Sequence, residues 1–195
     1  AAHAFPELVE IVDRPGAVSL VVQHGGEVRF DHVSFRYNAD ARAVDGISLD
    51  VKPGQKIALV GPSGAGKTTI FNLLLRFHDI DGGSITIDGQ DIRDVTLASL
   101  RDHIALVTQE PILFDESIAE NIAQGRRDAT RQEIIEAAQA AAAHDFIMAQ
   151  ADGYDSQVGE GGLKLSGGQR QRIAIARAML RNAPVQIGRA SCRER

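Results

Sequence analysis

The chain is poor in the features that mark disulfide-rich, membrane-spanning and nucleic-acid-binding proteins. Cys192 is the one cysteine in 195 residues, which excludes an internal disulfide framework and is typical of a reducing compartment. No apolar run reaches the roughly 18 residues of a membrane span. Lys and Arg number 21 against 26 Asp and Glu, whereas nucleic-acid-binding domains usually carry a basic excess. With 44% hydrophobic and 24% charged residues, the composition is that of an ordinary globular domain.

The start of the chain lacks both a methionine and the basic and apolar regions of a secretion signal. Apolar residues recur at helical spacing, at Phe5, Leu8, Val9 and Val12. This spacing predicts a short amphipathic helix over 3–13 that ends before Pro15-Gly16. We interpret it either as a packing helix or as the end of an upstream domain.

Strand patterns alternate with helix patterns along the chain. Alternating apolar residues over 28–36, 47–51 and 84–89 predict strands with one face in water. The continuous apolar runs Ile57–Val60 and Ile104–Val107 predict strands buried on both faces of a parallel sheet. An α/β fold with an antiparallel edge is therefore expected.

Gly61–Thr68 has the pattern G-x-x-x-x-G-K-T. It follows a predicted buried strand and opens a helix that runs to about Arg76, which is the context that a phosphate-binding loop requires. Glycines allow backbone N–H groups to turn toward phosphate oxygens, and the helix N-terminus adds positive charge. In such a loop Lys67 contacts the β- and γ-phosphates of ATP, and the Thr68 hydroxyl ligates Mg²⁺.

Three capping-box patterns predict helix starts at Ser117, Thr130 and Ser166. The last box lies in Leu165-Ser-Gly-Gly-Gln169, where two glycines precede a basic helix over 170–181. This is a second helix terminus suited to an anion. Because one nucleotide rarely needs two such cradles, we predict a head-to-tail dimer in which each ATP lies between the loops of two copies.

These motifs resemble the nucleotide-binding domain of an ATP-binding cassette (ABC) transporter over about residues 25–185. The resemblance implies a P-loop NTPase fold with an antiparallel β subdomain, an incomplete parallel core sheet and a helical signature subdomain at about 110–168. It implies that Tyr37 stacks on adenine and that Gln109 approaches Mg²⁺ and the attacking water. The nucleotide-binding residues are then Tyr37, Gly61, Pro62, Ser63, Gly64, Ala65, Gly66, Lys67, Thr68 and Thr69. The signature residues, which bind the ATP of the partner copy, are Leu165, Ser166, Gly167, Gly168 and Gln169.

Three segments are similar to those of ABC exporters: Phe114–Ile122, Val158–Gly161 and the predicted helix over 3–13. The resemblance implies a half-transporter with a fused transmembrane domain, at the cytoplasmic face of a membrane. Residues 1–24 would then be the end of the linker from that domain. An importer subunit, or a soluble clamp of the chromosome-maintenance or DNA-repair kind, is the alternative. Such clamps carry a long insertion before the signature, whereas Gln109 and Ser166 are only 57 positions apart.

The family pattern continues after Val185 with a buried strand that ends in Asp-Glu, the Mg²⁺ and general-base carboxylates. Here the chain reads Gln186-Ile-Gly-Arg-Ala-Ser-Cys-Arg-Glu-Arg195, so the general-base Glu is absent. Either this is a novel ending or 186–195 is a non-native tail, and we favour the second because Ile187–Arg195 matches one frame of a common sequencing adapter. We therefore expect that 57–60 and 104–107 lack a neighbouring strand, and that the chain folds poorly and does not hydrolyse ATP.

Overall fold

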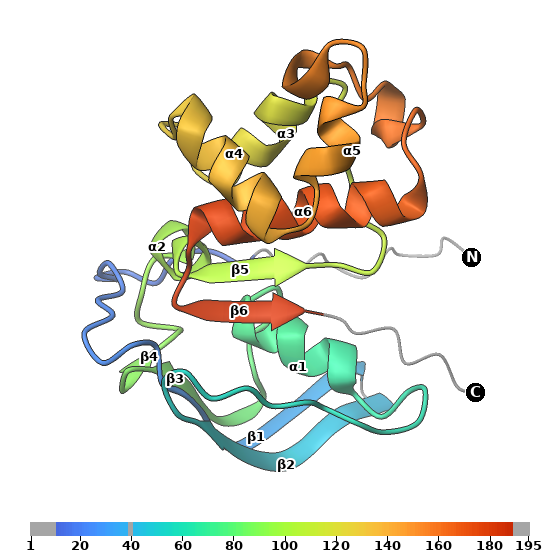
Figure 1. Ribbon diagram of the computed structural model, residues 1–195. Helices are drawn as coiled ribbons and strands as arrows, with labels where there is room; N and C mark the ends of the chain where they lie inside the picture. The colour runs from blue at the N-terminus through green and yellow to red at the C-terminus, as the bar shows by residue number, and fades with distance from the viewer. Residues whose placement is uncertain (1–10, 39–40, 189–195) are drawn as a thin grey trace, which may run out of the picture. The chain divides into compact units, whose positions relative to one another are not determined.

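The computed structural model describes residues 11–38 and 41–188, and the chain forms two compact units, 1–103 and 104–195. Figure 1 labels the helices and strands of each unit. Most of the predicted helix over 3–13 lies outside the described residues, and its last three residues are not helical. Cys192 also lies outside them. Within the described residues, no helix is both long and apolar enough to cross a membrane.

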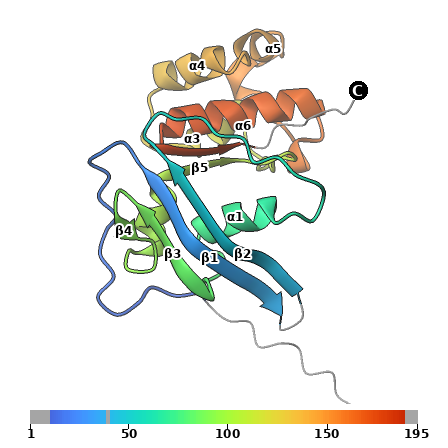
Figure 2. The same ribbon diagram turned by 90° about the horizontal axis from the view of Figure 1, so that it is seen from below.

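The first unit is built on an antiparallel sheet with the strand order β2-β1-β3-β4. The strands are β1 (Val28–Asn38), β2 (Ala41–Val51), β3 (Gly82–Ile87) and β4 (Gln90–Asp91). In the register, Val28 lies opposite Val51 on one side and Ile87 on the other. Figure 2 shows β1 between its two neighbours. The predicted strands over 28–36 and 47–51 are thus confirmed, and the one predicted over 84–89 is confirmed as far as Ile87, after which Asp88 and Gly89 form a turn.

Alternation along these strands places an apolar face on the core of the first unit. Val33, Ile85 and Ile87 are fully buried there. Helix α1 (Lys67–Leu74) adds Ile70, Leu73 and Leu74 to the buried set and contacts β2. Helix α2 (Leu97–Asp102) begins at Thr96, whose hydroxyl accepts a hydrogen bond from the Ser99 N–H. Helix α1, which follows the phosphate loop, therefore packs on the sheet through its contact with β2.

The segment Ile57–Val60 differs from its prediction. It is not a strand, and Ile57 and Val60 are 42% and 91% exposed. A β-strand exists only where a neighbour takes up its N–H and C=O groups. No strand of the described part of the chain pairs with this segment. An apolar run gives a segment a preference for burial, but the pairing that makes it a strand comes from elsewhere.

The described part of the second unit contains four α-helices and a two-stranded parallel sheet. Strands β5 (Ile104–Val107) and β6 (Val185–Gly188) pair in parallel. The helices are α3 (Ile118–Ala123), α4 (Arg131–Ala140), α5 (His144–Met148) and α6 (Gly167–Arg181). Two short 3₁₀ helices, η1 (Gly153–Asp155) and η2 (Glu160–Gly162), precede α6. Figure 1 shows α6 running beside β5, with α3, α4 and α5 on its other side.

The core of the second unit is aliphatic, with α6 at its centre. Ile122, Ile147 and Ile173 are fully buried within it. All three predicted capping boxes are present, because Ser117, Thr130 and Ser166 each exchange hydrogen bonds with the residue three positions later. The local start signals of α3, α4 and α6 are therefore confirmed.

Strand β6 corrects the expectation that β5 has no neighbour. Ile104 pairs with Val185 and Val107 with Gly188, so the strand extends three residues into the segment 186–195. Val185 and Ile187 are buried, and the residues between and after them are exposed. Strand pairing uses backbone groups, so two inward apolar residues at a spacing of two are sufficient even where the usual side chains are absent.

Candidate functional site

The phosphate loop occupies the turn that leads into α1. Gly64 and Gly66 have positive φ angles, +83° and +79°. A Cβ on Gly66 would lie 2.5 Å from the Ala43 carbonyl oxygen, so this position requires glycine. The Ala65 N–H donates to the Pro62 carbonyl at 3.2 Å and closes the turn. The loop is thus a curved backbone, which is the shape that a phosphate cradle needs.

Lys67 is the first residue of α1, and its ammonium folds back over the loop. The Nζ atom donates to the Gly61 carbonyl at 2.6 Å and to the Pro62 carbonyl at 2.7 Å. The first turn of α1 carries no acidic residue, so nothing there offsets the positive end of the helix. The neighbouring Thr68 is exposed. The loop therefore brings an ammonium, an exposed hydroxyl and a helix N-terminus together.

Tyr37 reaches the same loop from β1. Its hydroxyl lies 3.2 Å from Oγ1 of Thr69, which is buried in the first turn of α1. Half of the tyrosine, 51%, remains exposed. Thirty residues separate Tyr37 from Lys67 in the sequence, and the structure places both beside the start of α1.

The signature segment begins α6 in the second unit. The Ser166 N–H donates to Oε1 of Gln169 at 2.8 Å, and the Gln169 N–H donates to the Ser166 hydroxyl at 3.3 Å. Gly167 and Gly168 form the exposed first turn, where helix N–H groups have no preceding carbonyl to bind. The buried Leu165 anchors the segment, and Arg170 donates to its carbonyl at 2.7 Å. The glycines therefore present bare backbone N–H groups at a helix N-terminus.

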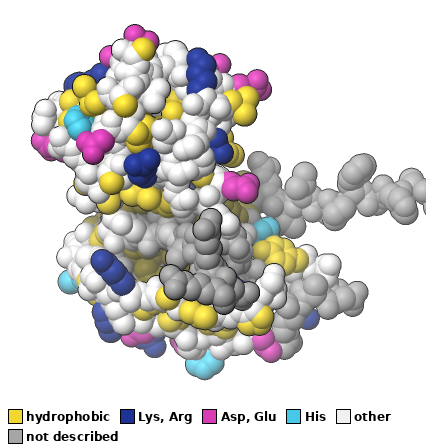
Figure 3. All heavy atoms as spheres, turned by 45° about the vertical axis from the view of Figure 1, so that its right-hand side comes forward, with side chains coloured by type: hydrophobic (Ala, Val, Ile, Leu, Met, Phe, Trp, Pro, Cys, Tyr) yellow, Lys and Arg dark blue, Asp and Glu magenta, His cyan; other side chains and the backbone are white. Residues whose placement is uncertain are grey.

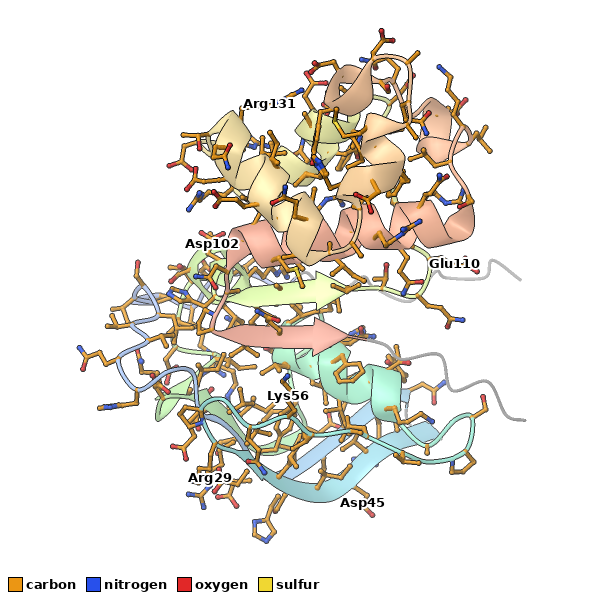
Figure 4. All side chains as sticks on the ribbon, viewed as in Figure 1. Arg29, Asp45, Lys56, Asp102, Glu110 and Arg131 are labelled. Carbon is orange, nitrogen blue, oxygen red and sulfur yellow. The ribbon has the colours of Figure 1, made fainter. Side chains whose placement is uncertain are left out.

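Gln109 is exposed in the bend that follows β5, next to Glu110, which Figure 4 labels. The Thr108 hydroxyl donates to the Glu110 carbonyl at 3.1 Å and shapes this bend. The predicted residues thus fall into two sets. The phosphate loop and Tyr37 belong to the first unit, whereas Gln109 and the signature belong to the second.

Sequence reasoning missed a polar clamp formed by Asn121 and Arg177. Asn121 is fully buried on α3; its side-chain oxygen accepts from the Phe114 N–H at 2.9 Å, and its amide donates to the Phe114 carbonyl at 3.0 Å. Arg177 on α6 donates to the backbone and side-chain oxygens of Asn121 at 2.9 and 3.1 Å, and to the Ile112 carbonyl at 3.3 Å. Burial lowers the pKa of the Arg177 guanidinium, and the Glu116 carboxylate opposes this. The only sequence signal was an Asn inside an apolar helical stretch.

This clamp ties the segment 112–117 to α6. Beside it lies a groove of about 470 Å³, lined in part by Ile112, Phe114 and Arg177. Ile112 and Phe114 are 76% and 50% exposed. On the face that Figure 3 draws, the helices of this unit show hydrophobic side chains interspersed with charged ones. The groove thus contains two exposed apolar side chains on a segment whose backbone is bound by Asn121 and Arg177.

Comparison with known proteins gives consistent matches. The sequence pattern described as "ABC transporter" matches residues 44–188. The chain is 54% identical to ATP-binding cassette sub-family B member 6 of Homo sapiens, over 90% of this chain and 21% of that protein. It is 56% identical to the ATP-dependent lipid A-core flippase of Saccharophagus degradans, over 83% of this chain and 28% of that protein. The chain therefore spans only a fifth to about a third of the length of such relatives.

A solved structure of a bacterial Atm1-family ABC exporter with ATP bound matches with a TM-score of 0.91 and 47% identity, over 97% of this chain and 33% of that one. At this identity and score, the predicted fold class, a P-loop NTPase domain of the α/β type, is confirmed.

Proposed function

Because the chain belongs to the ABC transporter family, we propose that it is the ATP-binding domain of an exporter, in which ATP binding and hydrolysis drive transport across a membrane. The exporters among its relatives support this, as do the exporter-like segments Phe114–Ile122 and Val158–Gly161. The observation that carries the proposal is the phosphate loop, whose glycine-dependent turn holds the Lys67 ammonium at the N-terminus of α1.

Within this loop the residues present fit a triphosphate. The glycines of the curved backbone 61–66 allow N–H groups to turn toward phosphate oxygens, and α1 adds the positive end of its dipole. Lys67 exchanges its two carbonyl partners for β- and γ-phosphate oxygens, since an ammonium forms stronger hydrogen bonds to charged than to neutral acceptors. Tyr37, half of which is exposed, holds the adenine. These residues bind and orient the substrate.

The side chain of Thr68 fits a magnesium ion at the phosphate loop, because its hydroxyl is exposed beside Lys67. For Gln109, whose amide is exposed after β5, the role of a second Mg²⁺ ligand rests on the resemblance to ABC domains alone. Oxygen donors are the ligands that Mg²⁺ takes in nucleotide sites. When bound, the ion neutralises charge on the phosphates during phosphoryl transfer.

The signature residues act on the ATP held by a second copy of the domain. The Ser166 hydroxyl and the N–H groups at Gly167 and Gly168 bind its γ-phosphate, and Gln169 keeps the turn in shape through its capping hydrogen bond. The pair is a head-to-tail homodimer at the cytoplasmic face of a membrane. Closure of the pair on ATP shifts the conformation of a fused transmembrane domain. That transmembrane domain contacts the groove beside Ile112 and Phe114.

By itself the chain binds ATP without hydrolysing it. Hydrolysis needs a carboxylate that accepts the proton of the attacking water. In β6 the residues after Val185 are Gln, Ile and Gly, none of which can act as a base. We propose residues 25–185 as the nucleotide-binding domain and residues 186–195 as a non-native tail.

Titration of the purified 195-residue chain with ATP and Mg²⁺ in a calorimeter tests this function. We expect binding without phosphate release. Lys67→Ala should weaken binding about 10- to 100-fold, the equivalent of charge-assisted hydrogen bonds worth about 1.5–3 kcal/mol. Lys56→Ala is the matched control, because Lys56 is an exposed lysine before the loop and outside it (Figure 4). Equal losses in both variants would contradict the assignment, and steady phosphate release would contradict the inactivity of the chain.

Exporter and importer assignments are separated by the DNA that precedes this reading frame. Six predicted membrane spans in the same frame are expected for an exporter. A start codon near residue 25 would instead mean a separate importer subunit.

A further inference from the structure

Three aromatic rings from distant parts of the first unit meet beside the phosphate loop. Phe35 and Tyr37 lie on β1, and His78 follows α1. The ring centroids of Phe35 and Tyr37 are 4.9 Å apart, and His78 lies 5.2 Å from each of the two. Tyr37 is thus in contact with two rings, one from its own strand and one from the segment after α1.

The contacts fix the tyrosine and leave much of it exposed. Phe35 is buried at 6% exposure, so it is a fixed wall of the core, whereas Tyr37 is 51% exposed. Both neighbours meet Tyr37 nearly perpendicularly, at 83° and 89°, so neither stacks on it in parallel. The hydroxyl is held at the far end by Thr69 Oγ1 at 3.2 Å. The ring is therefore held by its hydroxyl and by two neighbouring rings.

We propose that His78 is a positioning residue that sets the preference of this site for a nucleotide over a bare polyphosphate. This rests on the proposed ATP-binding function, because it concerns the same site. A side chain that is held before binding loses less freedom when a base stacks on it. Among the described residues, His78 supplies the one ring contact of Tyr37 that comes from outside β1. It follows α1, the helix that the phosphate loop opens.

Base recognition and phosphate recognition depend on different residues of this site. Phosphate binding depends on the loop and Lys67, which His78 does not contact among the described interactions. Loss of His78 should therefore weaken ATP binding and leave tripolyphosphate binding unchanged. Aromatic pair contacts of this kind correspond to a loss of roughly two- to twelvefold.

The experiment compares binding of ATP and inorganic tripolyphosphate, each with Mg²⁺, to the 195-residue chain. We expect His78→Ala to lose affinity for ATP but not for tripolyphosphate. His78→Phe, which restores a ring, should keep its affinity for ATP. His24→Ala is the matched control, because His24 is exposed in the same unit and its bond to Asp88 uses the backbone N–H, which alanine retains. In a Tyr37→Ala background, His78→Ala should have no further effect, since it acts through Tyr37.

Fluorescence gives a second readout that does not depend on the affinity alone. The chain has two tyrosines and no tryptophan, so Tyr154→Phe leaves Tyr37 as the sole emitter. Its emission should change with saturating ATP and not with tripolyphosphate, and His78→Ala should reduce that change. Far-ultraviolet circular dichroism checks that each variant is folded. If His78→Ala does not fold, the binding of ATP and tripolyphosphate by His78→Phe tests the role of the ring.

The outcomes distinguish the two proposals. If the unaltered chain binds neither ligand, the proposed function fails and this inference with it. If it prefers ATP but His78→Ala keeps that preference, or loses both ligands equally, the role of His78 is refuted while the ATP site stands. Loss of the preference in His78→Phe as well as in His78→Ala would also refute it, because the ring would then not be the feature that matters.

Discussion

Replacing Asn121 by alanine is expected to destabilise the second unit at one identifiable point. The Asn121 side chain spans the turn before α3, where its oxygen accepts the Phe114 N–H and its amide donates to the carbonyls of Phe114 and Ser117. Both carbonyls have a second donor, the Glu116 N–H at 2.8 Å and the Asn121 N–H at 3.0 Å respectively. Alanine therefore removes the acceptor of two groups, the Phe114 N–H and Nη2 of Arg177, which have no other protein acceptor among the described residues.

The magnitude follows from this count. A partly buried N–H that loses its acceptor costs about 1–3 kcal/mol. Arg177 also loses one of its acceptors but keeps the backbone carbonyls of Asn121 and Ile112. We expect the free energy of unfolding to fall by about 2 kcal/mol.

Urea unfolding followed by circular dichroism measures this change, and hydrogen exchange of the 112–117 segment locates it. Gln124→Ala is the control on the same helix turn. The Gln124 side chain donates one hydrogen bond within the described residues, to Glu116 at 3.1 Å, so its removal should change stability by less than about 0.5 kcal/mol. A loss in Asn121→Ala no larger than in the control, or an unchanged exchange rate for the segment, would refute the clamp.

Three further predictions follow from local geometry. Gly66→Ala should destabilise the loop by about 1–3 kcal/mol, because φ is +79° and the Ala43 carbonyl blocks the new Cβ; thermal unfolding measures this. Ser166→Ala should cost about 1 kcal/mol through loss of the α6 cap, which helical circular dichroism during urea unfolding follows. Hydrogen bonds from the backbone and hydroxyl of Thr130 lower the pKa of Glu133 from 4.5 to about 2. Its contribution to stability is therefore full above about pH 5 and is lost as the pH falls toward 2; Glu133→Gln should flatten this part of a stability–pH curve.

Predictions from local sequence patterns agreed best with the structure. Ser117, Thr130 and Ser166 each begin a helix, since a cap and its partner three residues later satisfy one another without help from the rest of the chain. The turn before α1 is also a local structure, because its glycines and Lys67 lie within a few residues of one another. Predictions that depended on a partner were weaker. The apolar run Ile57–Val60 is exposed, whereas β6 forms from Val185–Gly188 despite its unusual sequence.

The sequence by itself determined the capped start of α6 and the glycine-dependent turn before α1, because a motif of five or eight residues carries its own backbone geometry. It also determined the family, through the order and spacing of those motifs. Only the tertiary structure decided what surrounds them: that Tyr37 is held by Thr69 and His78, and that Asn121 and Arg177 fasten the segment 112–117 to α6. Such contacts join residues 32 to 65 positions apart. They arise when the core brings distant segments together, and no local pattern records them.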